Sequence, residues 1–379
     1  MSTASHTEFN TEFLESLTHE TPFFVFSKKR LTDNLKDFKK YFPSALIQYA
    51  MKANAEPEVL QTLFEAGSGF EVASVYELNM LKKIGVPADK IIYGTSVKPI
   101  SHIKEFFEYG VDRFAFDSLP ELEKIASVAP GSKVYVRVAV NDTGSVFRFS
   151  EKFGTSKDNI VPLLQRAKER GMDPIGISFH VGSQASNPMS WANAITSIQP
   201  AIEHLHKLDI KLDVLNIGGG YPCAYGTTET ALTLEEIAEH TLPQYEKLPY
   251  QPKLILEPGR GIVATTAVLV TSVIGRVERQ GATWLFLDAG VYSALFEAMA
   301  YQGSTRYKVT SMRHSYDSGE MLFALAGPTG DSPDVITREA LLPQDLEVGD
   351  KLIFHDAGAY SLVATSPFNG FPRPAVYFV

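Results

Sequence analysis

Short apolar runs alternate with amphipathic segments through residue 261 of the chain. Segments such as EPEVLQTLFEAG and VYELNMLKKIG have apolar residues at helical spacing and end in glycine, which predicts helices. Strands that alternate with helices pair in parallel, because each crossover between parallel strands needs a dozen or more residues. Eight runs rich in β-branched and aromatic residues predict the strands, at 45–50, 69–74, 90–94, 113–117, 133–140, 175–182, 213–220 and 253–259.

The number of these units favours a closed barrel over an open sheet. Eight β–α units in roughly 220 residues match the size of a (β/α)8 barrel. The alternative is a doubly wound open sheet, which binds a nucleotide at a glycine-rich first turn. The first predicted strand ends instead in YAMKAN, which contains no glycine. We therefore predict an α/β fold with a (β/α)8 barrel over residues 28–261.

After residue 262 the pattern changes to β-type runs that are separated by turn signals, with few helical segments. These runs include TAVLVTSVIGRVER, ATWLFLDAGVY and MLFALAGP. The early run PFFVFS at 22–27 precedes the barrel and could add a strand to this part of the chain. We predict a second, mostly antiparallel β domain that is formed by residues 1–27 and 262–379.

Composition narrows the class of protein. The net charge is −9, from 35 Lys and Arg against 44 Asp and Glu, which argues against nucleic-acid binding because a phosphate backbone needs a positive face. A single cysteine, Cys223, excludes an intramolecular disulfide and a cysteine-built zinc site, and it is consistent with a reducing cytosol. The sequence shows neither a targeting segment nor an 18-residue apolar stretch. We expect a cytoplasmic protein with no metal site and no membrane partner.

In a barrel of this kind the active site lies where the strands end. Each polar residue there has an ordinary explanation as well: a lone lysine is usually a solvated charge, and three glycines can be only a turn. Together they favour a functional site, because the topology places all of them on one face. The chemistry-bearing residues at the strand ends are Lys52, Glu71, His180, Ser183, Gly218, Gly219, Gly220, Glu257 and Arg260.

The last two strand ends indicate a phosphate site, which barrels commonly place there. The segment 218–220 can bring backbone N–H groups close to an anion, and Arg260 can add a bidentate charged contact. A phosphate site opposite a strand-end lysine, here Lys52, indicates pyridoxal phosphate, whose aldehyde forms a Schiff base with lysine. Glu257 would keep the pyridine nitrogen protonated, which makes the ring an electron sink.

A family resemblance supports this interpretation. The motifs YAMKAN, GFEVAS, SFHVGS, IGGG, EPGR, AGPTGDSPD and GAYSLVATSPFNGF occur in this order. They resemble those of the alanine-racemase-fold (fold type III) decarboxylases that use pyridoxal phosphate, above all the ornithine, lysine and arginine decarboxylases. The resemblance runs from residue 22 to the C-terminus. It implies an amino-acid α-decarboxylase of polyamine biosynthesis, which acts on a small amino acid as a homodimer with shared active sites.

The resemblance also implies residue roles. Lys52 would form the Schiff base, His180 would stack on the cofactor ring, and Glu257 would pair with the pyridine nitrogen. Asp331, reaching in from the second subunit, and Phe368 would border the substrate, and Asp331 would complete the catalytic set. The remaining cofactor contacts would come from Arg148, Ser183, Gly219, Gly220, Arg260 and Tyr360.

Three departures from the family pattern matter. Gly330 stands in GPTGD where the relatives have a cysteine, and Glu71 stands where they have aspartate. The diamine enzymes have a Tyr-Asp pair for which this chain offers Tyr301 and Gln302, so the distal carboxylate is missing. We predict that Tyr301 and Gln302 border the substrate, and that L-ornithine and L-lysine are poor substrates compared with an amino acid whose distal group is neutral or larger and polar.

Three alternatives stay open at this point. One is a decarboxylase of a non-diamine intermediate, such as a citrulline-like compound, a carboxy-polyamine or a siderophore precursor. Another is a racemase of the same fold, but such racemases typically place arginine at the ring nitrogen, where this chain has Glu257. The last is a non-catalytic regulator, which the presence of Lys52, His180, Glu257, Arg260 and Tyr360 argues against.

Overall fold

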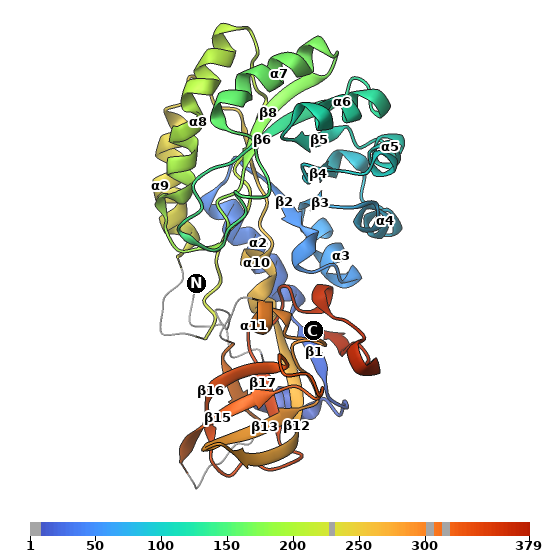
Figure 1. Ribbon diagram of the computed structural model, residues 1–379, viewed down its shortest axis with the longest axis vertical. Coiled ribbons are helices and arrows are strands. Elements are labelled where there is room, and N and C mark those ends of the chain that lie inside the picture. Colours follow the sequence, from blue (N-terminus) through green and yellow to red (C-terminus); the bar gives the residue numbers. More distant parts are fainter. Residues whose placement is uncertain (1–8, 227–231, 301–306, 313–318) are drawn as a thin grey trace. The chain divides into compact units, whose positions relative to one another are not determined.

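The computed structural model describes residues 9–226, 232–300, 307–312 and 319–379. The chain, which Figure 1 colours from blue at the N-terminus to red at the C-terminus, divides into two compact units. One unit, called the barrel unit below, comprises Thr32–Pro222 and Ala231–Ile262. The other, the sheet unit, comprises Met1–Leu31, Cys223–Thr230 and Val263–Val379.

The barrel unit contains a closed barrel of parallel strands in the order β10-β11-β2-β3-β4-β5-β6-β8 (Figure 1). All eight predicted runs form barrel strands, so the predicted (β/α)8 architecture is confirmed. Most strands end before the predicted run does, because the last residues of the run turn into the loops that carry the candidate site. The strands are β2 (Leu46–Ala50), β3 (Gly69–Val72), β4 (Ile91–Tyr93), β5 (Arg113–Phe116), β6 (Lys133–Val138), β8 (Asp173–Phe179), β10 (Val214–Asn216) and β11 (Lys253–Leu256).

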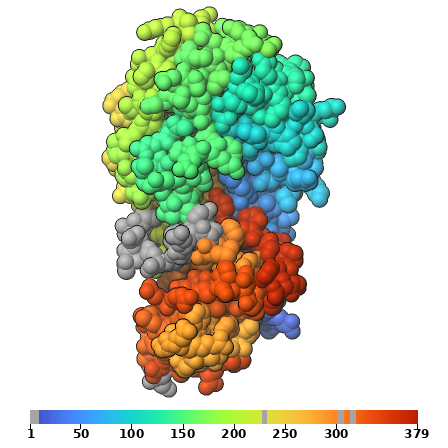
Figure 2. All heavy atoms as spheres, in the orientation of Figure 1, coloured from blue at the N-terminus to red at the C-terminus, as the bar shows by residue number. Residues whose placement is uncertain are grey.

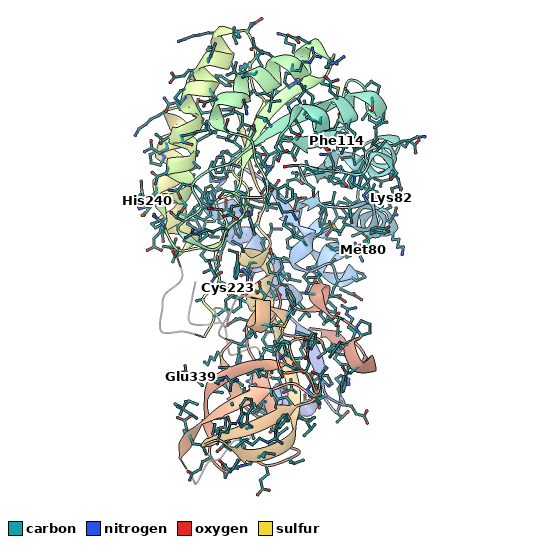
Figure 3. The ribbon with its side chains drawn as sticks, in the orientation of Figure 1. Met80, Lys82, Phe114, Cys223, His240 and Glu339 are labelled. Carbon is teal, nitrogen blue, oxygen red and sulfur yellow. The ribbon has the colours of Figure 1, made fainter. Side chains whose placement is uncertain are left out.

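Helices lie outside these strands (Figure 1). Ser74 caps α4 by accepting the Glu77 N–H at 3.3 Å. Met80 and Lys82 of this helix lie at the edge of the barrel unit (Figure 3). Phe114 of β5 lies farther in and is fully buried. The helices are α2 (Lys28–Tyr41), α3 (Pro57–Glu65), α4 (Val75–Lys83), α5 (Ile100–Tyr109), α6 (Leu119–Val128), α7 (Ile160–Glu169), α8 (Met189–Lys207), α9 (Leu234–Glu246) and α10 (Arg260–Val263).

Two short strands stand apart from the barrel wall. β7 (Ser145–Phe147) follows β6, β9 (Ser183–Ala185) follows β8, and the two pair antiparallel. This ladder holds together two of the loops at the carboxyl ends of the barrel strands. Single 3₁₀ turns occur at Met51–Ala53, Ala88–Lys90 and Lys157–Asn159.

The sheet unit is built on an eight-stranded sheet in the order β14-β17-β12-β13-β15-β16, with β1 pairing to β12 and β18. Only β1–β18 and β13–β15 run parallel among its described pairs, so the mostly antiparallel architecture predicted for this part of the chain is confirmed. Buried side chains from β1, β12 and β17, among them Phe23, Val268 and Ile353, form its core. The strands are β1 (Phe23–Phe26), β12 (Ala267–Arg279), β13 (Ala282–Leu287), β14 (Val309–Ser311), β15 (Glu320–Ala326), β16 (Val335–Pro343), β17 (Lys351–Phe354) and β18 (Ala375–Phe378).

Two short helices, α1 (Thr11–Ser16) and α11 (Phe296–Ala300), and 3₁₀ turns at Ala264–Thr266, Leu362–Ala364 and Phe368–Gly370 complete the described part of the chain. Among the described helices, none combines the length and the apolar character that crossing a bilayer requires.

Candidate active site

Lys52 lies in the 3₁₀ turn that follows β2. The Ala50 N–H donates to the Pro258 carbonyl at 3.0 Å, and a Cβ on Gly259 would lie 2.9 Å from Ala53 Cβ, so a glycine is needed for this close packing. The Lys52 Nζ donates to Glu71 Oε2 at 2.5 Å; the Glu71 side chain is 4% exposed and that of Lys52 is 44% exposed. The buried Glu71 carboxylate therefore fixes the position of the accessible Lys52 ammonium group.

A second carboxyl group, Glu77, lies near this pair and was missed by the sequence analysis. Its Oε2 accepts the Ala73 N–H at 2.6 Å. Burial raises the pKa of Glu77 to about 7; the bond from Ala73 and the charge of Lys52 oppose this rise, whereas the charge of Glu71 adds to it. Lys52 thus acts on Glu77 as well as on Glu71, of which Glu71 is in direct contact.

Glu257 follows β11 and is held by β10. Asn216 Nδ2 donates to Glu257 Oε1 at 2.6 Å, while Asn216 Oδ1 accepts the Gly218 N–H at 2.9 Å. Burial first, and then the negative charge of Glu71, raise the pKa of Glu257 to about 7. Lys52, the bond from Asn216 and Arg137 oppose this rise. A cation bound against this carboxyl would lower its pKa and stabilise its charged form.

His180 follows β8, and its protonation state is defined by its surroundings. Burial lowers the pKa of His180 well below its usual range, and the charges of Arg137 and Lys52 lower it further. Nδ1 accepts the Gly182 N–H at 3.1 Å, which leaves the proton of the neutral ring on Nε2. The Phe149 ring meets the imidazole edge to face, with 5.0 Å between the ring centroids. His180 therefore offers a neutral flat ring.

The segment 218–220 needs its glycines. Gly218 and Gly220 have φ of +67° and +100°, in the left-handed region, and a Cβ on either would lie within 2.4 Å of a backbone carbonyl oxygen. A Cβ on Gly219 would lie 3.0 Å from His180 Nε2. Side chains are thus absent from this segment, so its backbone can approach a bound group closely.

Arg260 supplies positive charge in the same unit. It begins α10 and is 3% exposed. Its Nη2 donates to Ser183 Oγ at 3.5 Å, and its guanidinium lies over the Phe147 ring at 5.3 Å from the centroid. Ser183 and Arg260, which come from β9 and α10, are thereby brought together as the sequence analysis expected.

Arg148 belongs to a loop that Asp142 organises. Asp142 is 4% exposed and accepts the N–H groups of Phe149 and Ser150 at 2.7 and 2.9 Å and the Ser150 hydroxyl at 2.8 Å. Burial alone would raise the pKa of Asp142, but these bonds outweigh it and hold the pKa below its usual value. Arg148 is exposed and makes no hydrogen bond or ion pair with another described residue.

We expect Asp142→Asn to loosen this loop. The amide offers one acceptor oxygen and no charge to three donors. The free energy of unfolding, measured in urea, should therefore fall by about 1–3 kcal/mol. Trypsin should also cleave faster after Arg148. Asp158→Asn, on an exposed 3₁₀ turn, is the control and should match the parent chain in both assays. Equal cleavage rates for the two variants would show that Asp142 does not hold the loop.

The sheet unit contains a second group of candidate residues. The Tyr292 hydroxyl donates to Asp331 Oδ2, and this bond raises the pKa of Tyr292. The Tyr292 ring stacks on Phe368, with 4.5 Å between centroids. Asp331 is exposed, and a Cβ on its neighbour Gly330 would meet nothing within 4 Å. The structure therefore brings Asp331 and Phe368 together through Tyr292, which the sequence analysis did not name.

Tyr360, in the same unit, has φ of +51°. A non-glycine residue in the left-handed region costs of order 1–3 kcal/mol and is most frequent at functional sites. Tyr301 and Gln302 lie outside the described residues.

The residues of the barrel unit fit pyridoxal phosphate. An accessible lysine follows β2, a side-chain-free segment and a buried arginine suit a phosphate group, and Glu257 suits a protonated pyridine nitrogen. His180, neutral and flat, suits stacking.

Comparisons with known proteins agree with this fit. Residues 28–264 match the family model described as the pyridoxal-binding domain of pyridoxal-dependent decarboxylases. The chain belongs to this family. It is 34% identical to a lysine/ornithine decarboxylase of Selenomonas ruminantium, over 93% of this chain and 88% of that one, and 34% identical to mouse ornithine decarboxylase, over 90% and 76%.

A solved structure extends the likeness to the whole fold. The lysine/ornithine decarboxylase of Vibrio vulnificus complexed with putrescine superposes with a TM-score of 0.89 at 30% identity, over 97% of this chain and 98% of that one. The chain is thus a pyridoxal-phosphate-dependent carboxy-lyase of the ornithine, lysine and arginine decarboxylase type.

The cofactor, when bound, supplies an electron sink for the carbon that loses carbon dioxide. The chain's own residues prepare the site for it. Glu71 keeps the Lys52 ammonium at the barrel mouth, and Asn216 orients the Glu257 carboxyl. The Gly182 N–H keeps the His180 proton on Nε2. Arg260 provides positive charge, and the segment 218–220 provides backbone without side chains, for an anion.

Proposed function

We propose that this decarboxylase removes the α-carboxylate of a basic amino acid of the ornithine, lysine and arginine class, using a distal pocket that differs from that of its relatives. The observation that carries this proposal is the exposed Asp331 carboxylate, oriented by the Tyr292 hydroxyl beside the Phe368 ring. Such a carboxylate is a partner for the distal cation of these amino acids, and an adjacent aromatic ring suits their methylene chain. The names of the relatives favour this class over the neutral or larger polar distal group that the missing carboxylate predicts, and the substrate assay below decides between the two.

The proposal includes residue roles. Lys52 binds the cofactor covalently, His180 stacks on its ring, and Glu257 pairs with its ring nitrogen. A glutamate at this nitrogen supports decarboxylation rather than racemisation, because a protonated ring accepts more negative charge. Further cofactor contacts come from Arg148, Ser183, Gly219, Gly220, Arg260 and Tyr360.

We further propose a homodimer in which Asp331 serves the site of the partner subunit. Mixing inactive Lys52→Ala with inactive Asp331→Ala subunits should then restore about one quarter of wild-type activity, since half of the randomly assorted dimers are mixed and each contains one intact site. Size-exclusion chromatography with differently tagged subunits verifies the exchange. Verified exchange without recovery would contradict the shared site.

The distal pocket is tested by substrate preference. If Gln302 occupies the position of the missing carboxylate, Gln302→Asp should raise kcat/KM for L-ornithine or L-lysine by about 10- to 150-fold, because the carboxylate adds a charge-assisted hydrogen bond to the distal ammonium. The assay measures kcat/KM for ornithine, lysine, arginine, citrulline and meso-diaminopimelate and identifies each amine by mass spectrometry. Efficient turnover of citrulline alone would contradict a basic substrate, and no gain in Gln302→Asp would contradict the role of Gln302.

A further inference from the structure

A hollow of about 160 Å³ lies on the barrel unit, and Lys52, His180 and Glu257 are not among its lining residues. One wall is the segment that leaves β6, and the other is α8 with the turn before it. In Figure 2, residues near 150 are green and α8 is yellow-green, and both reach the surface of the barrel unit. This volume is about ten times what one water molecule requires. The lining residues that matter here are Asn141, Thr143, Lys157, Asn187, Ser190 and Asn193.

Two of the lining asparagines, Asn141 and Asn187, use their side-chain oxygen within their own loops. Asn141 Oδ1 accepts the backbone N–H and the hydroxyl of Thr143 at 3.0 and 2.8 Å. Asn187 Oδ1 accepts the Met189 N–H at 2.9 Å. Because a backbone N–H can only donate, these bonds fix which amide atom is the oxygen. The Nδ2 group of each asparagine is therefore a donor that makes no hydrogen bond with another described residue and is available to a ligand.

Among the described lining residues, the one charged side chain is a lysine. Lys157 lines it and makes no ion pair with any residue in the described ranges, and none of the described lining residues is acidic. Asn193 on α8 adds a further amide, and Ser190, which is 9% exposed, adds a hydroxyl. Amide donors, a hydroxyl and one ammonium group without a carboxylate are the chemistry that binds a small oxyanion.

We propose that this hollow is a binding site for a small oxyanion, either a carboxylate or a phosphate, which is separate from the cofactor's phosphate site. Its occupant would contact Asn141 and Thr143, the residues on either side of Asp142. Asp142 in turn holds Phe149, whose ring lies against His180. Occupancy therefore orders the loop that carries Arg148 and Phe149, and it acts on the active site by positioning rather than by contact with the reacting atoms.

The test is isothermal titration calorimetry of the cofactor-loaded protein with inorganic phosphate and, separately, with citrate, at constant ionic strength set by chloride. The loaded protein is used because the cofactor then fills its own phosphate site. We expect saturable one-site binding of at least one of the two anions. Asn193→Asp, which places a carboxylate in the hollow without changing its shape, should weaken binding at least about tenfold. Lys157→Gln should weaken it as well.

The matched control is Lys207→Gln, which removes an exposed lysine from the other end of α8 and should leave binding unchanged. A second readout is trypsin cleavage after Arg148, which the bound anion should slow in the parent chain but not in Asn193→Asp. The proposal is overturned if neither anion binds saturably, or if Asn193→Asp binds as tightly as the parent chain. Neither assay measures decarboxylation, so the result stands apart from the identity of the substrate.

Discussion

Lys52→Arg is expected to abolish decarboxylation, by more than about 10⁴-fold, while it leaves the protein folded. The guanidinium stays protonated and cannot form an imine with an aldehyde, so covalent binding of the cofactor is lost. It still places a positive charge beside the buried Glu71 carboxylate, which now accepts a 2.5 Å bond from Lys52. Lys52→Arg therefore separates the loss of activity from any loss of stability.

Lys52→Ala should lose the same activity and also stability. Removing the ammonium leaves the Glu71 carboxylate, only 4% exposed, without its ion pair, which costs about 1–3 kcal/mol or more for a charged group. Borohydride reduction followed by peptide mass spectrometry measures the covalent link, and urea unfolding measures the stability. Lys83→Ala, on the exposed side of α4, is the control and should be active and stable. A reducible cofactor link in either Lys52 variant would show that another lysine carries the cofactor.

The architecture of the barrel was predictable because it depends on local signals. Each strand run is bounded by glycine or by a helical pattern, and the parallel topology then places Lys52, His180 and Glu257 at strand ends without any knowledge of contacts. These residues are distant in sequence, but the fold class alone assigns them to one face.

The contacts that tune the site were not predictable in the same way. Asn216 precedes Gly218 by two residues and is a plain strand-end residue in sequence, yet it holds Glu257 from the neighbouring strand. Arg137, a polar residue within an alternating strand, acts on His180 and Glu257 by charge alone. Such roles depend on distances between strands, which no spacing along one strand gives. Tyr292 was overlooked for the same reason, because its partner Asp331 lies on another loop.

Glu257→Gln is expected to change activity and stability in opposite directions. In the loaded protein the amide cannot carry the negative charge that keeps the ring nitrogen protonated, so kcat should fall by about 10²- to 10⁴-fold. The bond from Asn216 Nδ2 can be kept, because the amide oxygen of glutamine is still an acceptor. Cofactor binding through Lys52 should therefore persist.

In the cofactor-free protein the same substitution should be stabilising at high pH. The pKa of Glu257 is raised from an ordinary 4.5 to about 7, chiefly by burial, so the folded chain binds more protons than the unfolded chain between these values. Stability from this group is therefore fully present below pH 4.5 and is lost as the pH rises to 7, by up to about 3 kcal/mol. Glutamine does not titrate, so the variant avoids this loss.

Urea unfolding of the cofactor-free proteins at pH 5 and pH 8 measures this difference. From pH 5 to pH 8, we expect the free energy of unfolding of the variant to rise relative to that of the parent chain by on the order of 2–3 kcal/mol. Glu239→Gln, on the exposed face of α9, should show no such gain. A carboxyl group that destabilises the empty site but is required for turnover is maintained for its chemistry rather than for the fold. Equal pH dependence of Glu257→Gln and the parent chain, together with unchanged kcat, would remove Glu257 from the mechanism.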